Sequence, residues 1–145
     1  MTDTLGGTIV DTGEGFARGL TGYVAKIAAE LGVGLESCAI DGGPPASVYV
    51  ALDVRVTRFP DRELALLWDE RYGWAAAVET YSGEDLVILT YRGGDLLPSA
   101  GEVAKFVEAV LADDQSVGTP APPPDASEAE QRNVALRLRY HETIG

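Results

Sequence analysis

The stretch SVYVALDVRVT, residues 47–57, determines how the rest of the chain is interpreted. Its apolar side chains fall on every second position from Val48 to Val56, a period that is typical of a β-strand with one face in a core. The positions between them carry Tyr49, Ala51, Asp53 and Arg55. The connections to the next apolar segments are shorter than the roughly dozen residues that a parallel crossover needs, so we expect antiparallel hairpins.

The other predicted elements lie on both sides of this strand. Four further strands are expected at 35–40, 64–68, 74–81 and 86–91. Apolar residues at helical spacing predict helices over 16–31 and 99–112, and Ser99 with Glu102 is the signature of a capping box that begins the second one. This order predicts an α+β fold, an antiparallel sheet of four or five strands flanked by an N-terminal and a C-terminal helix.

The composition changes outside this unit. Residues 1–15 are rich in glycine and poor in large apolar side chains, so we interpret them as a flexible N-terminal tail. The α+β domain is expected over 16–112. A Pro-rich linker over 113–126 joins it to an extra C-terminal helix over 127–145, which begins with a second capping box.

Charge and cysteine content restrict the function further. The chain has 145 residues, and 23 acidic against 11 basic side chains give a formal net charge of −12. A surface this acidic repels phosphate groups, so we expect no direct contact with nucleic acid and none with a membrane. The single cysteine, Cys38, cannot form an internal disulfide, and the N-terminus lacks the basic and apolar regions of a signal peptide. Both observations favour the cytoplasm.

Four stretches between residues 16 and 111 share a pattern with a known family: PASVYVALD, RELALLWDERYGWAAAVET, SGEDLVILTYRGGDLLP and VAKFVEAVLA. Together they resemble an uncharacterised actinobacterial family, one of the domains of unknown function. The core WDE-x-x-GW-x-x-AVE and the turn SGEDL carry most of this resemblance. It implies an α+β domain of unassigned activity, and it supplies no catalytic residues to carry over.

The densest group of aromatic and charged side chains is the loop WDERYGW, residues 68–74. Its two tryptophans could clamp a ligand, with the charged residues between them supplying polar contacts. Alternatively, the tryptophans form a cross-strand pair that closes a charged turn, in which Gly73 takes a positive φ. The candidate residues for contact with a ligand or partner are Trp68, Asp69, Glu70, Arg71, Tyr72 and Trp74.

Signatures of catalysis are incomplete. The carboxylates Asp53, Asp69, Glu79, Glu84 and Asp85 could supply a hydrolase, but only if two of them converged in one cleft. Cys38 lacks a base nearby in the sequence, because the single histidine, His141, lies more than a hundred residues away. The glycine pairs match neither a P-loop nor a dinucleotide motif. We therefore expect no enzyme activity, no metal and no cofactor.

These observations favour a non-catalytic protein-interaction or regulatory module, whose partner the sequence does not identify. The alternative is a small-molecule-binding domain that uses the Trp68–Trp74 loop and a pocket beneath it, and a carboxylate-based hydrolase comes third. A deep apolar pocket lined by Trp68, Tyr72, Trp74 or Tyr91, with convergent polar groups, would favour the ligand-binding alternative.

Oligomeric state follows from strands that are apolar on both faces. The expected second face of the sheet carries Ala65, Leu67, Ala75, Ala77, Val87, Leu89 and Tyr91. Such a face needs a cover, which the C-terminal helix or a second copy of the chain could supply. We expect a homodimer in which the C-terminal helix takes part in the contact. The contact residues of that helix are expected to be Val134, Leu136, Leu138, Tyr140 and Ile144.

Overall fold

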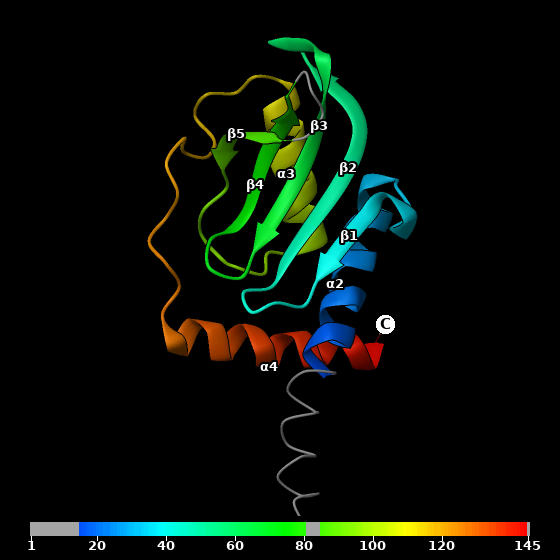
Figure 1. Ribbon diagram of the computed structural model, residues 1–145, viewed down its shortest axis with the longest axis vertical. Helices are drawn as coiled ribbons and strands as arrows, with labels where there is room; N and C mark the ends of the chain where they lie inside the picture. The colour runs from blue at the N-terminus through cyan, green and yellow to red at the C-terminus, as the bar shows by residue number, and fades with distance from the viewer. Residues whose placement is uncertain (1–14, 81–84, 145) are drawn as a thin grey trace, which may run out of the picture.

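The computed structural model describes residues 15–80 and 85–144, and within them the predicted α+β fold is confirmed (Figure 1). Helix α2 (Phe16–Leu31) comes first, and helices α3 (Ala100–Leu111) and α4 (Glu128–Ile144) follow the sheet. Between α2 and α3, the strands are β1 (Cys38–Asp41), β2 (Ser47–Val56), β3 (Phe59–Asp69), β4 (Gly73–Glu79) and β5 (Leu86–Tyr91). The predicted tail, except Gly15, and the turn SGED, except Asp85, lie outside the described residues.

The described strands form one five-stranded sheet in chain order, and every neighbouring pair is antiparallel. Helices α2 and α3 both pack on the same face of this sheet, behind it in Figure 1. The period-two apolar positions of the central strands point to these helices and are buried. They are Val48, Val50 and Leu52 on β2, Leu64, Leu66 and Trp68 on β3, and Trp74, Ala76 and Val78 on β4.

Two strand boundaries differ from the expected ones. Leu35–Ser37 forms a 3-10 turn, η2, and the first strand begins only at Cys38. The hairpin between β2 and β3 turns at residues 57–58, so Pro60 lies inside β3 and not in a loop. Proline lacks a backbone N–H, but it is tolerated there because the β3–β4 pairs begin only at Leu64. Strand β4 therefore needs no hydrogen bond from residue 60.

The opposite face of the sheet has no described helix over it, and we call it the open face. A β-bulge in β5 changes which residues it contains: Ala77 pairs with Ile88, while the next residue of β4, Ala76, pairs with Thr90. The extra residue in β5 shifts the alternation, so Leu86, Ile88 and Tyr91 share the open face. The expectation that Val87 and Leu89 lie there with Tyr91 is corrected, since strict alternation does not hold across the bulge.

Helix α4 packs on its own chain, across α2 at the end of the molecule and away from the open face (Figure 1). Val134 and Leu138 are buried in the same core as α2, whereas Leu136 is 62% exposed. The side chains of Tyr140 and Ile144 lie outside the described part of the structure. Helix α4 therefore does not cover the open face. No helix among the described residues is long and apolar enough to cross a membrane.

The contact between α2 and α4 depends on two glycines. A Cβ at Gly19 would collide with the carbonyl oxygen of Leu138, and one at Gly22 would lie 2.6 Å from that of His141. Glycine lets the two helix backbones approach this closely. Arg137 then ties α4 to the domain with paired hydrogen bonds to Asp95, at 2.8 and 3.0 Å, and a third to the Leu97 carbonyl oxygen.

Candidate functional site

The WDERYGW loop is the tight connection between β3 and β4. Trp68 and Trp74 are direct cross-strand partners, and Gly73 has a φ of 79°, a left-handed conformation that favours glycine at the end of such a turn. This is the cross-strand pair that the sequence left as one of its two interpretations.

Both indole rings lie in the core, each 1% exposed. The Trp68 Nε1 donates to the Leu96 carbonyl oxygen at 2.8 Å, and the Trp74 Nε1 donates to the Tyr23 hydroxyl at 3.0 Å. Tyr23 in turn donates to the Pro98 carbonyl oxygen at 2.7 Å. Because their polar atoms are satisfied inside the protein, the tryptophans anchor the loop.

The charged residues of the loop hold its shape. Asp69 accepts two side-chain hydrogen bonds from Arg71, both at 2.9 Å, and one from the Arg71 backbone N–H at 2.7 Å. Burial alone raises the pKa of Asp69, but these hydrogen bonds outweigh it and hold the pKa below its usual value. The Arg71 guanidinium also lies 4.9 Å from the centre of the Tyr72 ring. These contacts fix the orientation of the Arg71 guanidinium group.

Two neighbouring segments fasten the loop from outside. The Glu70 carboxylate accepts a 2.6 Å hydrogen bond from the Ala46 N–H, which connects the loop to the start of β2. The linker passes on the other side: the Ala126 N–H donates to the Arg71 carbonyl oxygen at 3.1 Å. Asp125 accepts a hydrogen bond from Tyr72 and thereby raises the pKa of that tyrosine. Earlier in the linker, Thr119 forms an antiparallel bridge with Tyr91 at the outer edge of β5.

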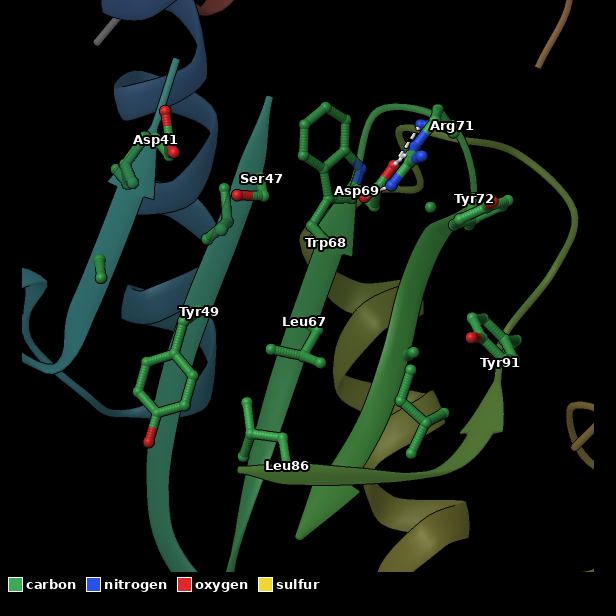
Figure 2. A pocket seen from close by; sticks show the side chains of 16 residues that line it. Asp41, Ser47, Tyr49, Leu67, Trp68, Asp69, Arg71, Tyr72, Leu86 and Tyr91 are labelled. Atoms are coloured by element: carbon green, nitrogen blue, oxygen red, sulfur yellow. Dashed lines mark hydrogen bonds and ion pairs between the residues drawn. The ribbon is translucent and has the colours of Figure 1, made fainter. Parts of the chain in front are cut away.

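Beside this loop the open face is hollowed into a cavity of about 460 Å³ (Figure 2). Its floor is made of small or aliphatic residues, namely Ala39, Ser47, Leu67, Gly73 and Ala75. Leu67 lies at its centre, between Tyr49 on β2 and Tyr91 on β5, and Leu86 lies at one end (Figure 2). Asp69, Arg71 and Tyr72 stand at the other end. The cavity therefore has an apolar floor, aromatic walls and one polar end.

The tyrosines of the wall are held by polar contacts of their own. Tyr72 and Tyr91 meet edge to face, with ring centres 6.2 Å apart. The Tyr49 hydroxyl points to Glu79, with its oxygen 3.4 Å from Oε2. Burial and the Glu79 charge together raise the pKa of Tyr49, so it remains a neutral phenol at physiological pH.

Of the six residues expected to contact a ligand or partner, Asp69, Arg71 and Tyr72 present side chains at the polar end of the cavity. Glu70 accepts a hydrogen bond from Ala46 at the start of β2. The rings of both tryptophans are buried in the core, and Trp68 is also among the residues that line the cavity. Sequence reasoning missed Tyr49, Leu86 and Ile88, which complete the wall. A usable signal was present: small residues at 73, 75 and 77 of a strand leave space above them on one face.

The structure does not bring Cys38 and His141 together, whereas the carboxylates Asp53 and Glu79 both act on Glu63 at one end of the open face. Burial and the neighbouring Glu36 raise the pKa of the Cys38 thiol, which keeps it protonated at neutral pH. His141 packs edge-on against Tyr23 on the helix side of the sheet, with ring centres 5.2 Å apart. No group of three or more potential metal ligands occurs among the described residues.

Fold and site together define an α+β domain with a ligand-sized cavity on the uncovered face of its sheet. Residues 23–109, more than half of the chain, match the model of a family of unknown function, DUF6292, and the chain belongs to this family. All residues that line the cavity fall inside the matched range, whereas α4 lies beyond it. The search of curated proteins and the search of solved structures returned no match.

Proposed function

We propose that this chain is a non-catalytic domain that binds a small organic molecule in the cavity of the open face. The observation that carries the proposal is the cavity itself: its volume of about 460 Å³ falls within the range of about 300–1,000 Å³ that is usual for ligand sites. An apolar floor supplies binding energy, and the few polar groups at one end fix an orientation.

The rigidity of the surroundings supports this reading. The floor belongs to paired strands, and the polar end is fixed by the Asp69–Arg71 pair and by Glu70 at Ala46. A site that is already formed loses little conformational entropy when a ligand enters, so more of the contact energy remains as affinity.

A neutral hydrophobic dye tests the proposal. N-Phenyl-1-naphthylamine becomes fluorescent in apolar surroundings, and a molecule of its size in such a cavity should bind with a dissociation constant on the order of tens of micromolar. The Ala75→Leu variant fills the floor and Ala39→Trp fills the cavity from the exposed edge strand. Each should weaken binding at least about tenfold, equivalent to roughly 1.4 kcal/mol.

The matched control is Ala51→Leu, because Ala51 lies on the open face of β2 but does not line the cavity. It adds the same side chain and should leave the affinity within about twofold of the wild type. Equal dye binding by all four proteins would contradict the proposal, since the dye would then occupy another surface. Far-ultraviolet circular dichroism confirms that each variant is folded.

A protein-interaction module is the second candidate, and one exposed apolar residue of the open face favours it. Ile88, on β5 beside the cavity, is 37% exposed. Under this second proposal, the open face binds another protein chain. If that chain is a second copy, the result is the homodimer that the sequence analysis expects. Light scattering distinguishes the two: a dimer mass that falls to the monomer value in Ile88→Asp supports the module and its homodimer.

Location and source complete the proposal. A free thiol at Cys38 fits the reducing cytoplasm, and fractionation of the native host tests that location. Nine arginines against two lysines are compatible with the high-GC genome of an actinobacterium.

A further inference from the structure

The charges around the cavity are unbalanced. Among the residues that line it, the acids are Asp41 and Asp69 and the one basic side chain is Arg71. Arg71 is neutralised by its paired hydrogen bonds to Asp69. The Asp41 carboxylate has no ion pair among the described residues, and the one hydrogen bond that it accepts there, at 2.9 Å, comes from the neutral Gly43 N–H. Asp125, which contacts Tyr72, adds a further carboxylate at this end.

The opposite end of the open face is acidic as well. Glu79 lies beside the Tyr49 hydroxyl. A hydrogen bond with Asp53 and the charge of Asp53 raise the pKa of Glu63, and Glu79 raises it further, so Glu63 lies within electrostatic reach of both other carboxyl groups. Arg55 lies opposite Glu63 in the register of β2 and β3, and its positive charge offsets only part of this acidity. A net negative potential therefore extends over both ends of the cavity.

The walls between these ends are aromatic. The faces of Tyr49, Tyr72 and Tyr91 carry the negative side of the ring quadrupole, which attracts cations. The protein shows this attraction beside the cavity, where the Arg71 guanidinium stacks over Tyr72. An anion in the same place would meet both the ring faces and the carboxylates with the wrong sign.

We infer that the ligand of this cavity is a flat organic cation, an aromatic or alicyclic body with a protonated amine, and this inference rests on the proposed function. The apolar body lies on Leu67 and Ala75 between the tyrosines. The ammonium group turns toward Asp41 at the rim.

Three probes with one body and different charge test the inference by isothermal titration calorimetry on the full chain. They are 2-naphthylmethylammonium, 2-naphthylmethanol and 2-naphthylacetate. In about 20 mM salt the cation should bind about tenfold more tightly than the anion, with the alcohol between them. At about 0.5 M salt the cation and anion should differ by about twofold or less, because salt screens charges at the rim.

Two matched substitutions locate the preference. Asp41→Asn removes the rim charge but keeps an oxygen for the Gly43 N–H, and it should reduce the cation-to-anion ratio about threefold. Asp61→Asn makes the same charge change on the exposed part of β3 outside the cavity lining, and the ratio should stay unchanged. Loss of the preference in Ala75→Leu confirms that it originates in the cavity and not in the net charge of −12.

The remaining outcomes separate the two proposals. If the alcohol binds and the cation binds no more tightly than the anion, the inference is overturned and the proposed function stands. If none of the probes binds and the neutral dye fails too, the proposed function fails. A full preference for the cation in Ala75→Leu, or a dimer in light scattering that excludes the probes, also overturns the inference.

Discussion

The two faces of the sheet are built from the same strands but packed in opposite ways. The helix-covered face carries large side chains such as Trp68, Trp74 and Leu66, which α2 and α3 close off completely. The open face carries small side chains at Ala75 and Ala77, and its larger residues stand around a cavity instead of filling it. Stability and binding are thus assigned to alternating residues of one strand, and a change at one position can affect one property and spare the other.

The largest expected effect comes from two adjacent leucines of β3. Leu66 is fully buried on the helix-covered face, so Leu66→Ala should lower the free energy of unfolding by about 2–5 kcal/mol. Leu67 lies half-buried on the open face, and Leu67→Ala should cost about 1 kcal/mol while it weakens dye binding. Urea denaturation measures both. Equal losses at the two positions would mean that the open face is buried in solution.

The next largest effect is expected at the contact between α4 and α2. Gly19→Ala places a methyl group against the Leu138 backbone and should destabilise the chain by about 1–3 kcal/mol, since two packed backbones must separate. Gly101→Ala is the control: at that exposed position of α3 the nearest atom is 4.0 Å away. There the added methyl group should stabilise the helix by about 0.5 kcal/mol. Thermal and urea unfolding would show the opposite signs.

A smaller change in the free energy of unfolding is expected from two arginine–aspartate pairs, one near each face of the sheet. Arg137→Gln breaks the link from α4 to Asp95 and to the Leu97 carbonyl oxygen, and it should cost about 1 kcal/mol. Arg71→Gln breaks a pair between residues two apart in the chain and should cost less stability than Arg137→Gln, because exposed ion pairs contribute little. Urea denaturation should rank them in this order, and a larger loss for Arg71→Gln would contradict the assignment of α4 to the core.

The smallest effect is a pH dependence confined to the helix side. Burial, together with the charges of Lys26 and Arg137, holds the pKa of His141 below its ordinary value, and the Lys26 Nζ lies 2.9 Å from the Nδ1 of His141. The unfolded chain therefore binds the proton more readily. The contribution of His141 to stability is present above about pH 6.5 and is lost as the pH falls below it toward the folded pKa.

His141→Asn measures that contribution, because its side-chain oxygen can still accept from Lys26 but does not titrate. The variant should lose less stability than the wild type between about pH 7 and 5 in urea denaturation. Dye binding at the open face should not respond to this substitution. Identical pH profiles for the two proteins would contradict the packing of His141 against Tyr23 and Lys26.

Much of the helix-covered face was predictable from local patterns. The alternation in residues 47–57 identified β2, and the capping boxes at Ser99 and Ser127 marked the starts of α3 and α4, where the structure contains both reciprocal hydrogen bonds. The cross-strand pair of Trp68 and Trp74 followed as one of two alternatives. These features depend on residues close in sequence, which is why a single sequence reveals them.

The candidate site was only partly predictable. The loop residues Asp69, Arg71 and Tyr72 were identified by composition, but Tyr49 and Leu86 come from strands that meet them only in the folded sheet. The sequence did not predict the position of α4 either. Its two buried apolar residues, Val134 and Leu138, lie one turn apart and do not specify the surface against which they pack.

By itself, the sequence determined the strand and helix order, the antiparallel connections and an apolar second face of the sheet, because periodicity and short loops act locally. Only the tertiary structure decided three other features. The bulge in β5, opposite Ala76 and Ala77, turned Ile88 onto the open face, the glycines of α2 allowed α4 to pack closely, and the sheet formed a cavity above Ala75. Each of these depends on distant segments meeting in space, and the free energy of such contacts is not encoded in any one stretch of the chain.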